Sequence, residues 1–199
     1  ESSRFNLTAN GKLNLYSLFA ELNRNLISSK GRTGFIVPSG IVSDDTTKAF
    51  FGDLVEKQQI SSVFDFENSQ PIFEGVHRSY KFCLMTLSGK PVHNADFIFF
   101  ATNTSQLSDP QRRFNLDPAE IAMFNLNTRT MPIFRTRADA RLTEKIYRHV
   151  PVLINEQTGE NPWKIQFDRM LDMSNDSGLF FDQPAPGRLR LYEAKYFHH

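Results

Sequence analysis

The chain has little of several features that would identify a function class at once. It holds one cysteine among 199 residues, Cys83, which excludes a disulfide framework or a cysteine-based zinc site within this sequence. No apolar run approaches the roughly twenty residues that a membrane helix needs, and the first residues do not read as a secretory signal. A single thiol inside an apolar run is typical of a buried side chain in a reduced compartment, so we expect a cytoplasmic protein.

Nucleotide and metal motifs are missing as well. The sequence contains neither G-x-G-x-x-G nor G-x-x-x-x-G-K-[ST], so it supports neither a self-contained dinucleotide fold nor a P-loop enzyme. No pair among the five histidines shows H-x-x-x-H spacing, and we expect no metal site. We expect His77 to face solvent or to cap a loop. The net charge of +1 does not by itself indicate a partner.

The first hundred residues alternate between helical and strand patterns. Apolar residues at helical spacing, with Asn14 as the cap, predict a helix over 15–28, formed by Leu15, Leu18, Phe19, Leu22 and Leu26. A buried strand follows at 34–37, and a helix over 46–57 opens with Asp44 and Asp45. With the next strand at 60–66, these elements form a parallel crossover unit.

Further along, strand patterns give way to a polar segment. Strands are predicted at 80–87 and 95–101, and the turn between them indicates an antiparallel pair. The polar segment 103–110 marks a boundary. Beyond it we expect a short helix at 118–124 capped by Asp117, a longer basic helix at 139–149, and a strand at 189–196.

Two candidate ligand sites lie where parallel strands end, because ligands of parallel sheets bind outside the carboxyl ends of the strands. The first is the turn Pro38-Ser39-Gly40, with Asp44 close behind. The second is the loop 67–76, which carries Phe73. Spacing alone favours a plain tight turn for the first and an aromatic side chain folded onto the core for the second.

Basic side chains gather in the second half of the chain. Six of them occur within twenty residues, namely Arg129, Arg135, Arg137, Arg141, Lys145 and Arg148. The last three share one face of the predicted helix, because they are spaced i, i+4 and i+7. Such a face can contact phosphates. The alternative is a solvated helix face whose charges pair with Asp139 and Glu144.

A nuclease pattern also occurs near the end of the chain. Glu193-Ala194-Lys195 lies in an expected strand, and Asp176 and Asp182 precede it. Nucleases hold Mg²⁺ with carboxylates and place a lysine near the attacking water. A match of three residues arises often by chance, however, and the upstream aspartates lack a clear hairpin context. The nuclease interpretation is therefore kept only as a lesser alternative.

The segments taken together resemble the gamma-class adenine-N6 DNA methyltransferases of restriction-modification and phage-defence systems, in their large multidomain form. The resemblance covers nearly the whole chain through the order and spacing of its pieces. These pieces are Gly34-Phe35-Ile36-Val37-Pro38-Ser39, Phe64-Asp65-Phe66-Glu67-Asn68, Lys81-Phe82-Cys83-Leu84, Asn127-Thr128-Arg129-Thr130, Pro132-Ile133-Phe134-Arg135, Asp172-Met173-Ser174-Asn175-Asp176-Ser177 and Leu191-Tyr192-Glu193-Ala194-Lys195.

The resemblance implies an α/β fold, the C-terminal half of a Rossmann-like methyltransferase sheet. Residues 1–104 resemble the end of the catalytic domain, and residues 105–199 resemble the mixed α+β start of a target-recognition region. The strand from Tyr80 corresponds to the family's seventh strand, antiparallel and inserted between the two strands before it. Phe73 matches the aromatic residue that stacks on the flipped adenine, beside Pro38 and Ser39. Many family members have proline after this aromatic residue, where this chain has glutamate.

The resemblance also implies an activity and partners. The whole protein is expected to transfer a methyl group from S-adenosylmethionine to adenine N6 in a specific sequence of double-stranded DNA, alone or with other restriction-modification subunits. The basic cluster is expected to face the DNA, and Glu193-Ala194-Lys195 belongs to a recurrent family segment, which weighs against a nuclease using Asp182, Glu193 and Lys195.

The family's glycine-containing cofactor loop and its catalytic Asn-Pro-Pro-aromatic motif are not in this sequence. Asn161-Pro162-Trp163 has one proline and lies too far downstream to replace that motif. We therefore expect this chain alone to be inactive. The competing interpretation is a non-catalytic DNA-binding or interaction module of a defence system.

Overall fold

The computed structural model divides into two compact units, residues 1–163 and residues 164–199, and each is described by itself. The first holds the sheet and the helices. In the second, the described residues form one short 3-10 turn, η3 (Ser177–Leu179). The structure describes residues 4–9, 11, 13–128, 130–169, 171–172 and 174–191.

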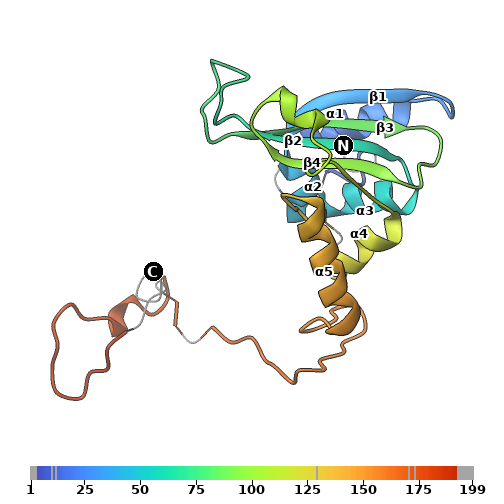
Figure 1. The fold of residues 1–199 in the computed structure, drawn as a ribbon. Helices are drawn as coiled ribbons and strands as arrows, with labels where there is room; N and C mark the ends of the chain where they lie inside the picture. Colours follow the sequence, from blue (N-terminus) through green and yellow to red (C-terminus); the bar gives the residue numbers. More distant parts are fainter. Residues whose placement is uncertain are drawn as a thin grey trace. The chain divides into compact units, whose positions relative to one another are not determined.

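The first unit is built on a five-stranded mixed sheet in the order β1-β3-β2-β4-β5 (Figure 1). Strand β3 is antiparallel to both β1 and β2, β2 is parallel to β4, and β5 is antiparallel to β4. Thus β1, β2 and β4 point the same way, and their carboxyl ends meet at one edge. The α/β class is confirmed, and so is the insertion of β3 between β1 and β2. The strands are β1 (Arg32–Pro38), β2 (Ile60–Glu67), β3 (Lys81–Ser88), β4 (Ala95–Ala101) and β5 (Phe114–Leu116).

Strands β3 and β4 run antiparallel as predicted, but they do not pair with each other, because β2 lies between them. The connection from β3 to β4 passes the start of β2 instead of making a hairpin. The Ser88 N–H donates to the Gln59 carbonyl at 2.8 Å, and the Val92 N–H donates to the Gln58 carbonyl at 2.7 Å. These bonds hold the connection against the residues that precede β2, so β4 reaches the far side of that strand.

The helices of the first unit follow the predicted order with one addition. The predicted helix over 46–57 is present as α3 (Lys48–Glu56), preceded by the 3-10 turn η1 (Asp45–Thr47). A short helix that was not predicted, α2 (Gly40–Ser43), comes before them. Asp44 has extended backbone angles and ends α2, and its N–H donates to the Gly40 carbonyl. The remaining elements are α1 (Leu15–Leu26), the 3-10 turn η2 (Thr104–Ser108), α4 (Pro118–Phe124) and α5 (Arg137–His149). No helix in the described ranges has the length and apolarity to cross a membrane.

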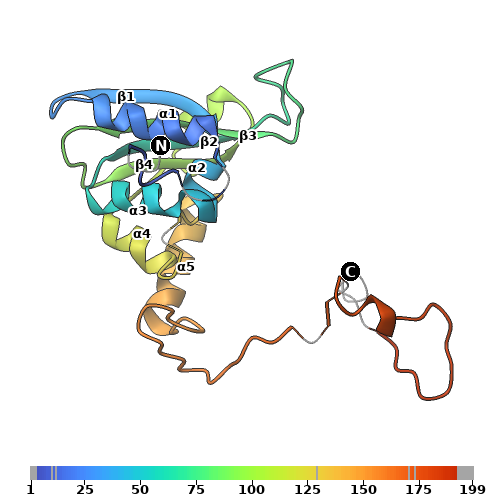
Figure 2. The ribbon, with the colours of Figure 1, turned by 180° about the vertical axis from the view of Figure 1, so that it is seen from behind.

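The main core lies between one face of the sheet and helices α1 to α4, which all sit on that side (Figure 2). Its sheet residues include Cys83, which is fully buried as predicted, and burial raises the pKa of this thiol to about 12. A smaller cluster on the opposite face joins Phe66, Phe82 and Ile98 and is covered by Leu107 of η2. The opposite face is therefore the more open one.

Helix α1 begins at the predicted residue and ends two residues before the predicted end, but it does not bury the predicted face. Its apolar stripe faces outward, with Leu15 73% and Leu26 72% exposed. The packed side carries Ser17, Ala20 and Glu21 instead. The buried Glu21 carboxylate accepts hydrogen bonds from the Thr8 hydroxyl at 2.6 Å and the Thr8 N–H at 3.0 Å. A residue distant in sequence therefore holds this side of the helix against the core.

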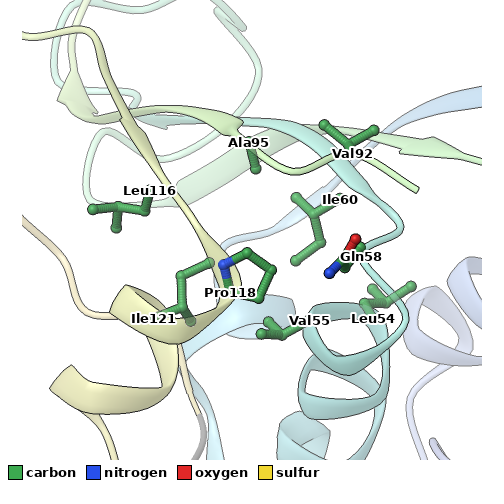
Figure 3. Close-up of a pocket in the computed structure, with 9 residues that line it drawn as sticks. All are labelled: Leu54, Val55, Gln58, Ile60, Val92, Ala95, Leu116, Pro118 and Ile121. Carbon is green, nitrogen blue, oxygen red and sulfur yellow. The ribbon is translucent and has the colours of Figure 1, made fainter.

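A small cavity remains in the core at the amino end of the strands (Figure 3). Leu54 and Val55 of α3 line it from below, and Ile60 and Ala95 line it from the sheet. Its volume is about 10 Å³, which is close to the limit for a single water molecule. The lining is almost entirely apolar, so this cavity is a packing gap and not a ligand site.

Candidate nucleic-acid interface at the carboxyl edge of the sheet

The two sequence-predicted loops meet at the edge where β1, β2 and β4 end and β3 begins. Ser39 follows β1, and Asp65 lies near the end of β2. Lys81 opens β3, and Phe100 stands next to the last residue of β4. The loop between β2 and β3 projects from this edge (Figure 1). We call this set of strand ends the carboxyl edge.

The predicted base-pocket residues come together around Phe82. The Phe73 ring meets the Phe82 ring edge-on, with centroids 5.1 Å apart, and Phe73 stays 40% exposed. Phe82 is the register partner of Pro38, and its other neighbour in the sheet is Phe66, whose ring stacks on it at 5.5 Å. Ser39 directly follows Pro38. The expectation that Phe73 folds onto the core is thus met only in part, because the ring keeps an open face. Its contact with a base stays a prediction.

Asn68 fixes the backbone of the loop that carries Phe73. Its side-chain N–H₂ donates to the carbonyls of Phe73 at 3.0 Å and Val76 at 2.9 Å. Its side-chain oxygen accepts the N–H groups of Ile72 at 3.0 Å and Phe73 at 3.1 Å. Asn68 is fully buried. The loop is therefore exposed in its side chains but held at its base by four hydrogen bonds from one residue.

A buried carboxylate joins the ends of three strands. The Ser39 hydroxyl donates to Asp65 Oδ1, and the Phe100 N–H donates to Asp65 Oδ2 at 3.1 Å. Asp65 is 3% exposed, and burial raises its pKa above the ordinary value. The hydrogen bonds from Ser39 and Phe100, and the charge of Lys81, act in the opposite direction. Asp65 thus links β1, β2 and β4 at the carboxyl edge.

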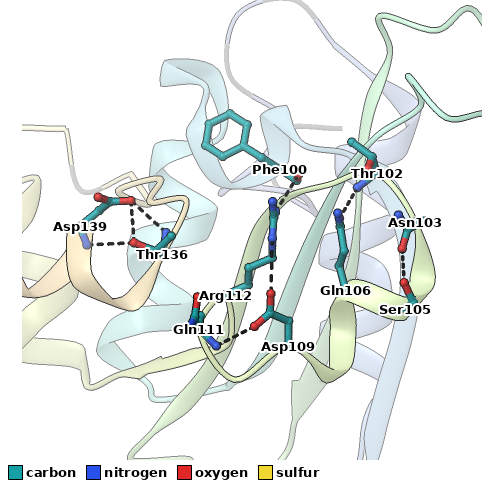
Figure 4. Close-up of polar contacts among 10 residues, drawn as sticks. All are labelled: Phe100, Thr102, Asn103, Ser105, Gln106, Asp109, Gln111, Arg112, Thr136 and Asp139. Carbon is teal, nitrogen blue, oxygen red and sulfur yellow. Dashed lines mark hydrogen bonds and ion pairs between the residues drawn. The ribbon is translucent and has the colours of Figure 1, made fainter.

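Phe100 has an unusual backbone for a bulky residue. Its φ of +55° lies in the left-handed region, which costs about 1–2 kcal/mol for a side chain with a Cβ. Phe100 lies where the regular register between β2 and β4 shifts, between Ile98 and Ala101. Asp65 holds its N–H, and the Arg112 guanidinium donates to its carbonyl at 3.3 Å (Figure 4). The half-buried Phe100 ring lies 5.3 Å from Lys81 Nζ and 4.9 Å from Arg135 Cζ.

The connection after β4 also fixes the start of α5. Asp109 accepts the Gln111 N–H at 2.8 Å and pairs with Arg112 at 3.8 Å (Figure 4). The Arg137 N–H in turn donates to the Gln111 carbonyl at 2.9 Å. A capping box between Thr136 and Asp139 completes the first turn of the helix. The residues just before α5 are therefore fastened to the carboxyl edge.

The predicted DNA-binding residues divide into an edge group and a helix group. Arg135 lies on Phe100, while Arg137, Arg141, Lys145 and Arg148 are exposed on α5. Arg129 lies outside the described residues. Among the described members of this set, the predicted pairing with acidic residues holds at Arg148 alone, which meets Glu144 at 2.7 Å. Asp139 is engaged in the capping box and not with an arginine.

The remaining sequence predictions have mixed outcomes. His77 is exposed, and its Nδ1 meets the Ser79 hydroxyl at 2.8 Å, so its solvent-facing place in the loop is confirmed. Asp182 is exposed in the second unit, while Glu193 and Lys195 lie outside the described residues. The strand predicted at 189–196 has no regular structure over 189–191, and the rest lies outside the described part. Within the described residues, no cluster of His, Cys, Asp or Glu could hold a metal ion.

The turn after β1 is closely packed. Above Gly40, the Asp44 carboxylate fills the space, since an added Cβ would meet Asp44 Oδ2 at 2.2 Å. A cavity of about 260 Å³ lies elsewhere, between α4, α5 and the segment after α5, with Met123, Leu126 and Tyr147 among its lining residues. That lining is largely apolar and shares no residue with the carboxyl edge.

Comparison with known proteins bears on the first part of the chain. Residues 1–73 match the family model described as Eco57I restriction-modification methylase. The expected resemblance to restriction-modification methylases is thereby confirmed over residues 1–73, which include α1, β1, α2, α3 and β2 and end at Phe73. No curated protein shows a significant match to the chain.

Three solved structures are similar to the chain at low identity. The type IIG restriction endonuclease BpuSI is 21% identical, with a TM-score of 0.38 over 47% of this chain and 11% of its own. The methyltransferase subunit of a type I restriction-modification system from Streptococcus thermophilus is 15% identical, with a TM-score of 0.39 over 73% of this chain and 26% of its own. A DrdV–DNA complex is 9% identical, with a TM-score of 0.36 over 72% of this chain and 13% of its own. The chain thus spans between 11% and 26% of these proteins.

Proposed function

We propose that this chain, whose first 73 residues match a restriction-modification methylase, is part of a site-specific DNA methyltransferase acting on adenine N6. The methyl donor we propose is S-adenosylmethionine, bound by residues other than those described. The contribution of the chain is to hold the target base and part of the DNA. One observation carries this proposal: Phe73 stands half-exposed at the carboxyl edge, on a loop whose backbone Asn68 fixes.

Chemistry on a base inside duplex DNA requires that the base leave the stack. An extruded base rests against apolar or aromatic side chains, which replace its neighbours in the duplex. The Phe73 ring supplies such a surface, since the residue stays 40% exposed despite its T-shaped contact with Phe82. The turn at Pro38 and Ser39 lies beside it, and we propose that it forms the wall of the same pocket.

The basic residues supply the second part of the proposed role. Arg135 and Arg137 stand at the junction between the carboxyl edge and α5, and Arg141, Lys145 and Arg148 continue along the helix. Together with Arg129, these side chains form a proposed contact surface for the phosphates of double-stranded DNA. Phosphate contacts position a protein on the duplex without reading its sequence.

The proposal is tested with the chain itself and two kinds of duplex. One duplex is fully paired, and the other places a single adenine opposite an abasic site, which lowers the cost of extruding that base. Fluorescence anisotropy should show tighter binding of the second duplex. Stacking of a base on an aromatic ring contributes about 1–3 kcal/mol, so Phe73→Ala should reduce this preference by about fivefold or more.

Tyr80→Ala is the matched control, because Tyr80 is an exposed aromatic residue of the same loop and its ring contacts His77 instead of Phe82. This variant should keep the preference for the unpaired adenine. Equal binding of both duplexes by the unmodified chain contradicts the proposed base pocket. An undiminished preference in Phe73→Ala contradicts it as well.

A further inference from the structure

Two cations share one aromatic ring at the carboxyl edge. Lys81 Nζ and Arg135 Cζ lie 5.3 Å and 4.9 Å from the centroid of the Phe100 ring. Lys81 opens β3 and Arg135 precedes α5, so segments more than fifty residues apart in the sequence converge there. Both side chains are exposed. The ring therefore holds two positive charges in one place on the surface.

Within the described residues, neither of these two cations forms an ion pair, whereas several arginines do. Arg112 pairs with Asp109, Arg113 pairs with Asp96, and Arg148 pairs with Glu144. Over the described ranges, no carboxylate lies within ion-pair distance of Lys81 or Arg135. Asp65 acts on Lys81 only through its field, since its oxygens accept hydrogen bonds from Ser39 and Phe100. Glu67 is the register partner of Lys81 on β2 but forms no ion pair with it. Two like charges held on one ring therefore attract an anion from solution.

The ring that carries the two cations is itself held in place. Its backbone is left-handed at φ +55°, and both of its backbone polar groups are hydrogen-bonded, the N–H to Asp65 and the carbonyl to Arg112. Backbone strain of this kind persists only where surrounding contacts impose it, and it clusters at binding sites. A cation above an aromatic face gains about 0.5–1 kcal/mol at an exposed site. Phe100 thus sets the place of both charges.

The cation pair shares the carboxyl edge with the proposed base pocket. Lys81 and Phe82 are consecutive in β3, so their side chains leave opposite faces of the sheet, and the Phe73 ring rests on Phe82. DNA that places a base on Phe73 brings its backbone to this edge. Lysine offers a point charge and arginine a planar fork, and both bind phosphate oxygens.

We propose that Lys81 and Arg135, positioned on Phe100, bind the phosphodiester backbone of DNA at the same carboxyl edge that carries Phe73. This inference rests on the proposed function and adds to it a defined backbone contact. The ligand is an anionic phosphodiester of a nucleic acid. Free inorganic phosphate shares the same chemistry and is the alternative occupant that the experiment separates.

The test is the salt dependence of duplex binding by the double variant Lys81→Gln/Arg135→Gln. Each phosphate contact contributes about 0.9 to the slope of log K against log salt. The slope should therefore fall by about two, and affinity at low salt should fall by about tenfold. Arg32→Gln/Lys90→Gln is the matched control, since it removes the same charge from exposed residues at the opposite edge of the sheet. The salt slope of Arg32→Gln/Lys90→Gln should therefore stay larger than that of Lys81→Gln/Arg135→Gln.

A second double variant controls for loss of folding. Lys81→Arg/Arg135→Lys keeps both charges and should retain the slope of the unmodified chain. An unchanged slope in Lys81→Gln/Arg135→Gln, or an equal change in the control, overturns the proposal. Release of DNA by inorganic phosphate at constant ionic strength, to the level of the double variant, assigns the site to free phosphate and also overturns it.

The outcome is distinguishable from failure of the proposed function. Lys81→Gln/Arg135→Gln should keep the preference for the duplex with the unpaired adenine, and Phe73→Ala should keep the salt slope. If the slope changes but no preference exists, the backbone contact stands and the base pocket fails. If the preference exists but the slope does not change, the base pocket stands and the backbone contact fails.

Discussion

The buried carboxylate of Asp65 accepts the backbone N–H of Phe100 at 3.1 Å and thereby joins the ends of β2 and β4. The same carboxylate accepts the hydroxyl of Ser39 at the end of β1. Phe100 in turn carries Lys81 and Arg135 on its ring. The geometry of the carboxyl edge therefore depends on one acidic side chain, and its removal should have measurable effects.

Asp65 should make stability depend on pH in a defined direction. Burial raises its pKa above the ordinary value of 3.8, so the folded state keeps the proton to higher pH than the unfolded state does. Between those two values the folded state binds more protons, and the free energy of unfolding contributed by Asp65 falls as pH rises. Urea unfolding from about pH 3 to about pH 7 should show the unmodified chain losing stability relative to Asp65→Asn. A stability difference that is constant, or that grows in favour of aspartate, contradicts this assignment.

At position 100, glycine should give a more stable protein than alanine, which is the reverse of the usual order in a strand. Alanine normally stabilises a strand relative to glycine, but at φ +55° the alanine Cβ is strained and glycine is not. Phe100→Gly should therefore be more stable than Phe100→Ala by about 1 kcal/mol, although both lose the ring. Equilibrium urea unfolding of the two variants measures the difference. If alanine proves the more stable replacement, the left-handed backbone is not imposed by the fold.

Asn68 should control the order of the loop that carries Phe73. The side-chain N–H₂ of Asn68 donates to the carbonyls of Phe73 and Val76. In Asn68→Asp a carboxylate oxygen takes its place, and this oxygen repels both carbonyls. The cost is about 2 kcal/mol or more, because buried groups lose their partners. Limited digestion with trypsin should cleave faster after Arg78 in this loop. Glu74→Ala, at an exposed position of the same loop, should leave the cleavage rate unchanged, and equal rates in all three proteins contradict the role of Asn68.

The exposed basic residues of α5 should contribute unequally to DNA binding. Arg148 already pairs with Glu144 at 2.7 Å, whereas no ion pair engages Arg141 or Lys145 in the described structure. Replacement of Arg141 or Lys145 by glutamine should lower the salt slope of duplex binding by about one each. Arg148→Gln should lower it by less, because Glu144 neutralises part of its charge. Equal effects at all three positions, or none, contradict the surface drawn here.

Local signals in the sequence were enough to predict some elements closely. Helix α4 begins where Asp117 and Pro118 indicate, and Asp117 forms a capping box with Glu120. Strands β1 and β2 and their shared direction followed from apolar runs separated by a helix. These features depend on residues within one or two turns of each other, so they are readable without the fold.

Features that depend on distant partners were missed. Glu21 is buried because Thr8, thirteen residues away, hydrogen-bonds to it, and this reversed the expected packing of α1. The place of β4 depends on hydrogen bonds that cross the start of β2. Asp65 and Phe100 are thirty-five residues apart, and phenylalanine gives no local sign of a left-handed backbone. The strand ends could be predicted as a site, but not the carboxylate and ring that organise it.

The central claim is that Phe73 receives an unpaired adenine at the carboxyl edge, and photo-cross-linking tests it most directly. A duplex carrying a photoreactive adenine opposite an abasic site is irradiated with the chain, and the product is digested with trypsin and analysed by mass spectrometry. The account predicts a cross-link in the peptide of residues 58–78, which contains Phe73, and its loss in Phe73→Ala. A cross-link confined to other peptides, or one unchanged in Phe73→Ala, contradicts the claim.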